Sequence, residues 1–419
     1  MRASRGSLFA LLALLASSVA SCGGGDDASS HATDAGASHG DASSNDGGTT
    51  GGDGGGSARD ASASDARGDA RALGTPFVYV GSAGFSGRED NAIHVFALDP
   101  STGVLSPRGA PVAAGANPSY MVADASRHFL YVVNESASAV AAFSIDQATG
   151  APSLVNRVPS GGSGPTHVSL DGSGKFVLVA NYTSGDATVV ARKSDGSLGG
   201  VVGSRAFGGN AATHCIRTDP ANRFAFVANK DLNIVAELAL DASGALRDNT
   251  PPSIAPANGA GPRHIDFHPT GRYAYVIDEN ASAIDAYTYD AGAGLLAKLQ
   301  TISTLPVGFA GANTGAEIQV APSGRFVYGS NRGHDSIAVF AVDQATGKLT
   351  LVDHTKTRGK TPRQFQIDEA GKFLLVGNQD SDSVAVFAID ANAGTLAPLG
   401  GLTTVASPAY VGVVWLPGP

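Results

Sequence analysis

The sequence predicts an all-β fold, a seven-bladed β-propeller, because one short strand motif recurs seven times along the chain. Each copy begins with an aromatic residue, continues with a short apolar run and usually ends at Asn or Asp, and successive copies start about 47 to 53 residues apart. A repeat of this length built from short strands indicates propeller blades. The copies begin at Phe77, Phe129, Phe176, Phe224, Tyr273, Phe326 and Phe373.

The fifth copy shows how one repeat makes a blade. Residues 262–269, 273–277, 282–289 and 295–301 are expected to form four short strands, separated by turns rich in Gly, Asp and Pro. Four antiparallel strands joined by such turns form one blade. The aromatic residue that begins each second strand has the bulk to pack between neighbouring blades.

The two ends of the repeat region predict how the ring closes. The first copy lacks an opening strand, whereas the last copy is followed by a surplus apolar strand at residues 408–415. Pairing this strand with the first copy hides the edges that an open sheet would expose. The C-terminal strand is therefore predicted to complete blade one.

Residues 1–22 are interpreted as a lipoprotein signal peptide of an exported bacterial protein. Two arginines precede an apolar run that is too short to span a bilayer comfortably. The run ends in Val-Ala-Ser-Cys, which resembles a lipobox, so Cys22 is expected to carry a lipid that anchors the chain to the membrane. Gly23 rather than Asp follows, which favours the outer membrane. The alternative is an ordinary secretory signal that is cleaved nearby.

Residues 23–75 are dominated by Gly, Ser, Ala and Asp, which predicts a disordered tether before a folded domain at 76–419. The tether carries nine Asp and three Arg, so most of the net charge of −9 lies in it. The acidic balance argues against nucleic-acid binding. With Cys22 lipidated, Cys215 has no partner for an intramolecular disulfide, and the domain is expected to be a monomer.

Two sets of positions differ from blade to blade, although scaffold positions should be alike in all blades. One set lies at the start of the first strand, and the other directly follows the second strand. Both should lie at the same face of a propeller, so their side chains are expected to converge at the mouth of the channel. The charged and histidine side chains of these sets are Glu135, His167, His214, Lys230, Arg263, His264, Glu279, Glu317, Arg332 and Arg363.

A mixed cluster of Arg, Lys, His and Glu suits an anionic or oxygen-rich small molecule. The alternative is a solvated charged rim without a ligand. No metal-ligand pattern is recognised in the folded part, so no metal is expected. His128 and His268 lie beside turns and are expected at the surface.

The run Gly-Pro-Arg-His-Ile-Asp-Phe-His-Pro-Thr-Gly-Arg-Tyr-Ala-Tyr-Val-Ile-Asp-Glu, from Gly261 to Glu279, resembles the lactonase-type seven-bladed propellers. That family includes bacterial 6-phosphogluconolactonases of propeller type and fungal carboxymuconate cyclases. The resemblance covers about residues 75–417, with further similar runs at 316–328 and 361–365. It implies a lactone hydrolase of carbohydrate metabolism that needs no cofactor and takes a sugar-acid or related lactone.

The resemblance also implies the active-site residues. The family's His, Arg, Glu and Arg fall on His214, Arg263, Glu279 and Arg332, which the comparison of blades selected independently. One departure is that many members carry Pro-His-x-His where this chain reads Ala211-Ala-Thr-His. Only the second histidine is present, which puts in doubt any mechanism that needs both.

Lactone hydrolysis needs a base for the attacking water and positive charge for the oxyanion. Arg263 and Arg332 are expected to supply the charge. His214 is the leading base and Glu279 the second, unless Glu279 instead orients Arg263 or His214. Substrate binding is expected from Lys230, His264, Glu317 and Arg363.

Two other functions stay open. One is a non-catalytic, surface-tethered propeller that binds a small molecule or a protein partner. The other is a cycloisomerase, like the fungal relatives. Because sugar-phosphate lactones are cytoplasmic metabolites and this domain is expected outside the cytoplasm, the broader term lactonase is preferred.

Overall fold

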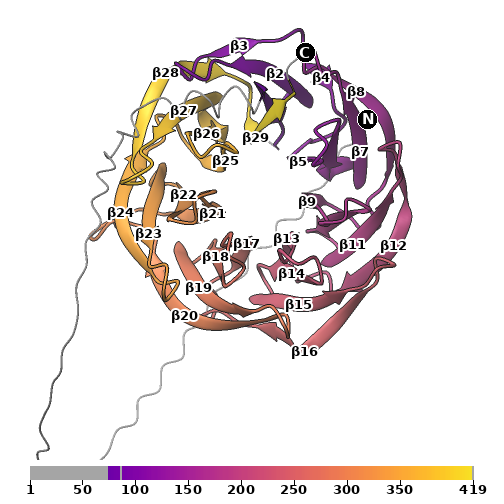
Figure 1. Ribbon diagram of the computed structural model, residues 1–419, viewed down its shortest axis with the longest axis vertical. Coiled ribbons are helices and arrows are strands. Elements are labelled where there is room, and N and C mark those ends of the chain that lie inside the picture. The colour runs from indigo at the N-terminus through magenta and orange to yellow at the C-terminus, as the bar shows by residue number, and fades with distance from the viewer. Residues whose placement is uncertain (1–73, 85–86, 418–419) are drawn as a thin grey trace, which may run out of the picture. The chain divides into compact units, whose positions relative to one another are not determined.

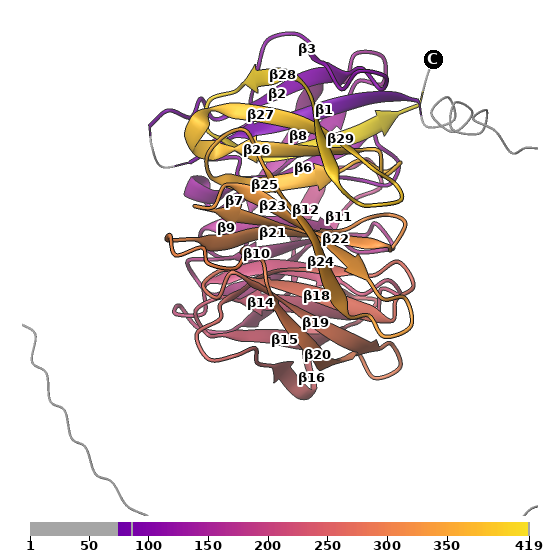
Figure 2. The same ribbon diagram turned by 90° about the vertical axis from the view of Figure 1, so that its left-hand side faces the viewer.

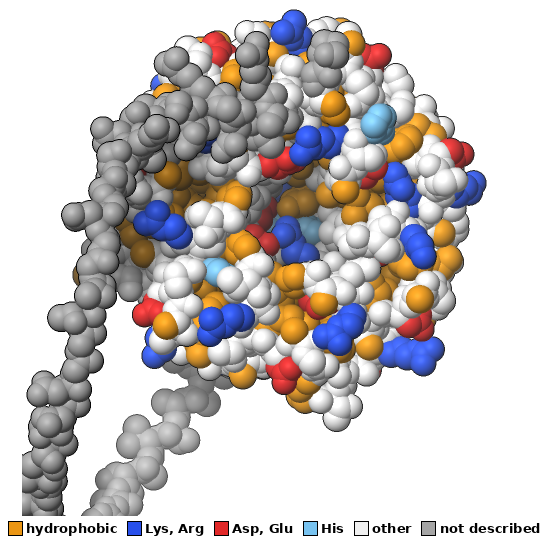
Figure 3. Space-filling model, in the orientation of Figure 1, with side chains coloured by type: hydrophobic (Ala, Val, Ile, Leu, Met, Phe, Trp, Pro, Cys, Tyr) orange, Lys and Arg blue, Asp and Glu red, His pale blue; other side chains and the backbone are white. Residues whose placement is uncertain are grey.

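The computed structural model describes residues 74–84 and 87–417, which form seven antiparallel sheets arranged as the blades of a ring (Figure 1). Figure 2 turns the ring by 90°, and Figure 3 shows one of its faces, hollowed at the centre, with charged and histidine side chains around the hollow. The helical elements of the described residues are two 3-10 turns, η1 (Glu135–Ala137) and η2 (Gln379–Ser381). The predicted seven-bladed, all-β fold is confirmed.

The blades are numbered along the chain, and the strands of each are given from the centre outwards. Blade 1 contains β29 (Pro408–Leu416), β1 (Thr75–Ser82), β2 (Ala92–Leu98), and β3 (Leu105–Pro107) and β4 (Val112–Ala113), which both pair with β2. Blade 2 contains β5 (Tyr120–Ala123), β6 (Phe129–Asn134), β7 (Ala139–Ile145) and β8 (Pro152–Pro159). Blade 3 contains β9 (Pro165–Leu170), β10 (Phe176–Asn181), β11 (Asp186–Arg192) and β12 (Leu198–Ala206).

The remaining four blades repeat this order. Blade 4 contains β13 (Thr213–Thr218), β14 (Phe224–Asn229), β15 (Ile234–Leu240) and β16 (Leu246–Ile254). Blade 5 contains β17 (Pro262–Phe267), β18 (Tyr273–Asp278), β19 (Ala283–Asp290) and β20 (Leu295–Ser303). Blade 6 contains β21 (Thr314–Val320), β22 (Phe326–Arg332), β23 (Ser336–Val342) and β24 (Leu349–Lys356). Blade 7 contains β25 (Pro362–Ile367), β26 (Phe373–Asn378), β27 (Ser383–Ile389) and β28 (Leu396–Thr404).

The C-terminal strand closes the ring. β29 pairs antiparallel with β1 along its whole length, from Thr75 opposite Leu416 to Ser82 opposite Pro408. Trp415 in β29 is 1% exposed and belongs to the apolar cluster of blades 7 and 1. The prediction that this strand completes blade one is therefore confirmed.

One boundary differs from the sequence-based expectation. β1 begins at Thr75, one residue before the expected start at 76, because Thr75 already pairs with Leu416. The expected signal peptide at 1–22, with Cys22, and the tether up to residue 73 lie outside the described residues. Within the part of the chain that is described, no helix has the length and apolar character needed to cross a membrane.

Neighbouring blades are joined by the aromatic residues that begin the second strands. Six of the seven lie against a glycine of positive φ in the next blade, where an added Cβ would come within 3.0 Å of the ring. The pairs are Phe77–Gly150, Phe129–Gly196, Phe176–Gly244, Phe224–Gly294, Tyr273–Gly347 and Phe326–Gly394. This confirms the expected packing between blades.

Tyrosine hydroxyls reinforce four of these contacts. In each case, the tyrosine lies two residues after the motif aromatic, and its hydroxyl donates to the carbonyl of the same glycine at 2.8–2.9 Å. The donors are Tyr79, Tyr131, Tyr275 and Tyr328. Since each hydroxyl is buried, this bond removes the cost of leaving a polar group unpaired.

The expectation for His268 is wrong, whereas His128 is exposed as expected. His268 is 2% exposed, and its Nε2 lies 2.8 Å from the carbonyl oxygen of Gly324 in blade 6. Its Nδ1 lies 2.8 Å from Thr270 Oγ1. The turn that carries His268 packs on the next blade instead of facing solvent, and the imidazole fills the space left by a glycine without a side chain.

Gly347→Ala should lower the free energy of unfolding by roughly 2–4 kcal/mol, because it combines a strained backbone with a steric clash. Gly347 has φ +74°, and an added Cβ would meet the Tyr273 ring at 2.3 Å. Urea unfolding followed by circular dichroism measures the change. The matched control is Gly200→Ala, since Gly200 has no atom within 4 Å of an added Cβ. Equal effects of the two substitutions would contradict the packing argument.

Candidate active site

Most inner strands carry a β-bulge near their start. In the pairing of β17 with β18, Arg263 is the extra residue between Pro262 and His264, each of which has its own partner. A bulge breaks the alternation of a strand and re-aims the side chain of its extra residue. The corresponding extra residues are Thr166 in β9, His214 in β13, Arg363 in β25 and Ala409 in β29.

The bulges place consecutive residues in two layers of the channel. The first layer surrounds a cavity of about 130 Å³, and we call it the mouth site: Glu135, Thr166, Tyr182, His214, Glu279, Arg332 and Arg363. The second layer fills the channel, and we call it the floor: Tyr120, His167, His264, Glu317 and Tyr410. Ring centroids within the floor are 4.4–5.7 Å apart, so the aromatic side chains pack against one another across the axis.

Glu279 joins two arginines at the mouth. Its Oε2 lies 3.0 Å from Arg263 Nε and 3.0 Å from Arg332 Nη2. Burial would raise the pKa of Glu279, but Arg263, Arg332 and Lys230 outweigh burial and hold that pKa below its ordinary value. Glu279 is therefore an anion at neutral pH.

Arg263 lies behind Glu279 and does not line the cavity. The side chain is 3% exposed, and its Nη1 donates to the carbonyl oxygen of Ala316 at 2.6 Å. Burial, and then the neighbouring guanidinium of Arg332, lower the pKa of Arg263 to about 9. Arg263 thus stays protonated at neutral pH.

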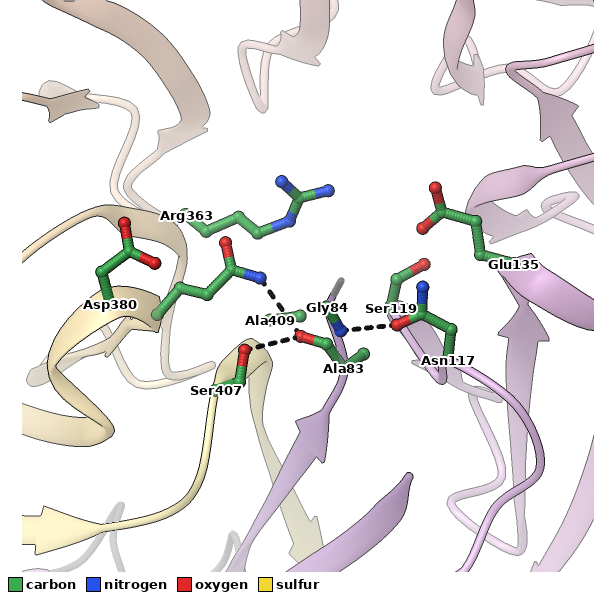
Figure 4. Close-up of a pocket in the computed structure, with 10 residues that line it drawn as sticks. Ala83, Gly84, Asn117, Ser119, Glu135, Arg363, Asp380, Ser407 and Ala409 are labelled. Carbon is green, nitrogen blue, oxygen red and sulfur yellow. Dashed lines mark hydrogen bonds between the residues drawn. The ribbon is translucent and has the colours of Figure 1, made fainter. Parts of the chain in front are cut away.

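The other two arginines line the cavity. Arg332 Nη2 donates to the carbonyl oxygen of Gly315 at 3.0 Å, which fixes the guanidinium beside Glu279. Arg363 forms no hydrogen bond or ion pair with any residue in the described ranges. Figure 4 shows its guanidinium reaching into the space opposite Glu135. Arg363 is therefore the cation of the mouth site that the fold leaves uncommitted.

His214 lies among these charges as a neutral group. The side chain is 6% exposed, and its ring contacts Tyr182 edge-on with centroids 5.7 Å apart. Its Nδ1 has no hydrogen-bond partner in the described part of the chain. Burial, followed by the positive charge of Arg263, holds the pKa of His214 well below its ordinary value. The neutral imidazole can accept a proton.

The floor contains a buried histidine–carboxyl pair. His264 Nδ1 lies 3.0 Å from Glu317 Oε1, and His264 Nε2 lies 3.4 Å from Arg263 Nη1. Because a guanidinium only donates hydrogen bonds, Nε2 accepts and Nδ1 carries the hydrogen that is donated to Glu317. Burial raises the pKa of Glu317 to about 7. The pair thus contacts Arg263 from the floor side of the channel, through His264 Nε2.

The structure brings only part of the expected site to the cavity. His214, Glu279, Arg332 and Arg363 line it. The expected residues that do not line it are Lys230, Arg263, His264 and Glu317. Lys230 instead lies 2.5 Å from Asp231 Oδ1.

Two lining residues, Thr166 and Tyr182, were not singled out from the sequence. Both occupy the same variable positions as the charged residues of the other blades. The signal that would have found them is position in the repeat, because neither side chain carries a charge.

The opposite mouth of the channel is a cavity of about 440 Å³ whose polar side chains serve the fold. Gln319 Nε2 donates to a backbone carbonyl of β25 at 2.9 Å. Gln364 and Gln366 accept backbone N–H groups of β29 at 2.7 and 3.0 Å. Arg217 pairs with Asp266 at 2.5 Å. These bonds link neighbouring inner strands, whereas the mouth site keeps Arg363 and His214 Nδ1 without partners.

The chain matches known lactonases in sequence and structure. The family described as Lactonase, 7-bladed beta-propeller, matches residues 77–413. The 6-phosphogluconolactonase of Bacillus subtilis is 38% identical over 190 residues, which are 43% of this chain and 54% of that protein. The 6-phosphogluconolactonase of Pectobacterium carotovorum is 34% identical over 168 residues, 40% of this chain and 50% of that protein. The chain thus spans about half the length of these curated relatives.

The solved structure of a periplasmic gluconolactonase from Pseudomonas aeruginosa is similar over the whole ring. Its TM-score is 0.75 at 28% sequence identity, and the match covers 82% of this chain and 100% of that one. The family match reaches from the first strand motif to β29, the strand that closes the ring. The chain therefore belongs to the seven-bladed β-propeller lactonase family.

Proposed function

We propose that this chain hydrolyses the lactone of a sugar acid or a related compound at the mouth site. One observation carries the proposal: a neutral histidine with an unpaired Nδ1 and an uncommitted arginine meet there beside an anchored Arg–Glu pair. At the opposite mouth, the glutamines and the Arg–Asp pair hold the inner strands together. The family and the named activities of the relatives support the reaction type.

The base in this proposal is His214. Water must lose a proton as it attacks the lactone carbonyl, and a neutral imidazole accepts it. Glu279 is the weaker choice because two arginines share its Oε2. The proton taken by His214 then passes to the ring oxygen as the carbonyl–oxygen bond breaks, which yields the open hydroxy acid.

The oxyanion of the tetrahedral intermediate is proposed to lie against Arg332. Glu279 and the carbonyl oxygen of Gly315 fix this guanidinium before substrate arrives, and a preorganised donor stabilises developing charge most effectively. Arg363 has no protein partner and is assigned to substrate binding. Arg263 is a positioning residue that acts through Glu279.

We also propose that the chain is exported and anchored by a lipid on Cys22, at the outer membrane. The support is the Val-Ala-Ser-Cys sequence after a short apolar run, with Gly23 following it. The periplasmic location named for the Pseudomonas aeruginosa relative agrees with export. A domain tethered in this way meets lactones outside the cytoplasm.

His214→Gln should lower kcat on glucono-δ-lactone by about 10²–10⁴-fold, because it removes the base while keeping a polar side chain. Acid release measures the rate against the spontaneous background. The matched control is His128→Gln, since His128 is exposed beside a turn and should leave kcat unchanged. Full activity of the His214 variant would reject this residue as the base.

The acid limb of kcat/KM should lie below pH 6.5, the ordinary pKa of histidine. The folded protein holds the pKa of His214 down, so the imidazole stays neutral and able to accept a proton as the pH falls through 6.5. A profile between pH 5 and 8 tests this. A midpoint at or above pH 6.5 would contradict it, as would an unchanged limb in His214→Gln.

Cys22→Ser should abolish incorporation of labelled palmitate and release the chain from the membrane fraction of an expressing bacterium. The lipid is attached to the cysteine sulfur, so a hydroxyl cannot replace it. Cys215→Ser is the control, because Cys215 is buried in blade 4 and should leave labelling unchanged. Persistent labelling of the Cys22 variant would rule out the proposed anchor.

A further inference from the structure

A second hollow of about 280 Å³ adjoins the mouth site, over blades 1, 2 and 7 (Figure 4). We call it the side hollow. Glu135 and Arg363 line both spaces and so stand between them. A ligand group that leaves the mouth site between these two side chains enters the side hollow.

Hydrogen bonds between blades build the wall of the side hollow. The carbonyl oxygen of Ala83 accepts Gln379 Nε2 at 3.1 Å and Ser407 Oγ at 3.0 Å. On the other side, the backbone N–H of Gly84 donates to Asn117 Oδ1 at 2.5 Å. These bonds connect blades 7, 1 and 2, so the hollow has a fixed shape and is no packing defect.

The side hollow offers unpaired donors together with an acceptor, the carboxyl group of Glu135, which also interacts with Ser119. Figure 4 shows Arg363 and Glu135 reaching into the space from opposite sides. Asn117 is 2% exposed, and its Nδ2 has no hydrogen-bond partner in the described residues. A hydroxyl group both donates and accepts, so it can satisfy Glu135 as well as Arg363, whereas a phosphate dianion only accepts.

The charges of the side hollow disfavour a phosphate. Arg363 is its one uncommitted cation among the described lining residues, and Glu135 faces it. Asp380 adds a second carboxylate, which lies 3.4 Å from Arg88. A phosphate dianion would approach Glu135 without a second free guanidinium or ammonium group to offset the repulsion.

We propose that the side hollow is the subsite for the uncharged, hydroxyl-rich part of the lactone, and that the chain selects unphosphorylated sugar lactones over phosphorylated ones. This inference rests on the proposed function for its substrate. It assigns the side hollow to the part of the lactone that can carry a phosphate, and it assigns the discrimination against that phosphate to Glu135.

The test measures binding and turnover separately on the full-length chain. Calorimetry gives the Kd of gluconate and of 6-phosphogluconate, and acid release gives kcat/KM for the two corresponding lactones. We expect gluconate to bind at least as tightly as 6-phosphogluconate. Glu135→Gln should shift the ratio of the two Kd values by about tenfold towards 6-phosphogluconate, because it removes the repelling charge.

The matched control is Glu369→Gln, since Glu369 forms an exposed pair with Arg127 away from both hollows. Wild-type protein that binds 6-phosphogluconate more tightly than gluconate would overturn the subsite. So would a Glu135→Gln ratio that moves no further than that of the control. If the predicted binding ratios hold while neither lactone is hydrolysed, the proposed function fails and the subsite stands. If neither acid binds, the subsite fails.

Discussion

The pairing of β29 with β1 is the constraint on which the rest of the structure depends. Each blade packs its sheet faces on two neighbours, and only a closed ring gives every blade both. Closure also fixes the distance across blade 1. Glu135 comes from blade 2 and Arg363 from blade 7, and these two side chains face each other because blade 1, completed by β29, lies between them.

The bulges of the inner strands turn this scaffold into a site. In a regular strand, consecutive side chains point to opposite faces of the sheet, which in a propeller means towards the two neighbouring blades. The extra residue in β17 breaks this alternation, so Arg263 can reach Glu279 behind the mouth site while His264, its neighbour in sequence, packs into the floor. The same bulge in β13 and β25 allows His214 and Arg363 to line the mouth site.

The sequence predicts the ring well because its signals are local and repeated. The motif spacing gives seven blades, and the surplus strand at 408–415 gives the closure. The bulges leave no comparable signal, so the sequence could not show that Arg263 lies behind Glu279 or that His264 and Glu317, which were expected to bind substrate, lie in the floor. The expectation that His268 lies at the surface was wrong for another reason. Its partner Gly324 lies 56 residues away in the next blade, and no local pattern reports such a contact.

The charges around the mouth site explain why Arg363 has no protein partner and which species along the reaction the site stabilises. Arg332 and Arg363 line the mouth site and Arg263 lies directly behind it, so these three arginines outnumber the two lining carboxylates, Glu279 and Glu135, by one. Burial, followed by the positive charge of neighbouring arginines, lowers the pKa values of Arg263 and Arg332.

A neutral lactone is stabilised little by the excess positive charge of the arginines. The tetrahedral intermediate carries one negative charge and is stabilised most. Interactions that strengthen only as charge develops accelerate the reaction, while those that bind substrate equally well do not. The same reasoning limits the substrate. A permanent dianion in the ground state would take up the positive charge before the reaction begins, and it would leave less of that charge for the oxyanion.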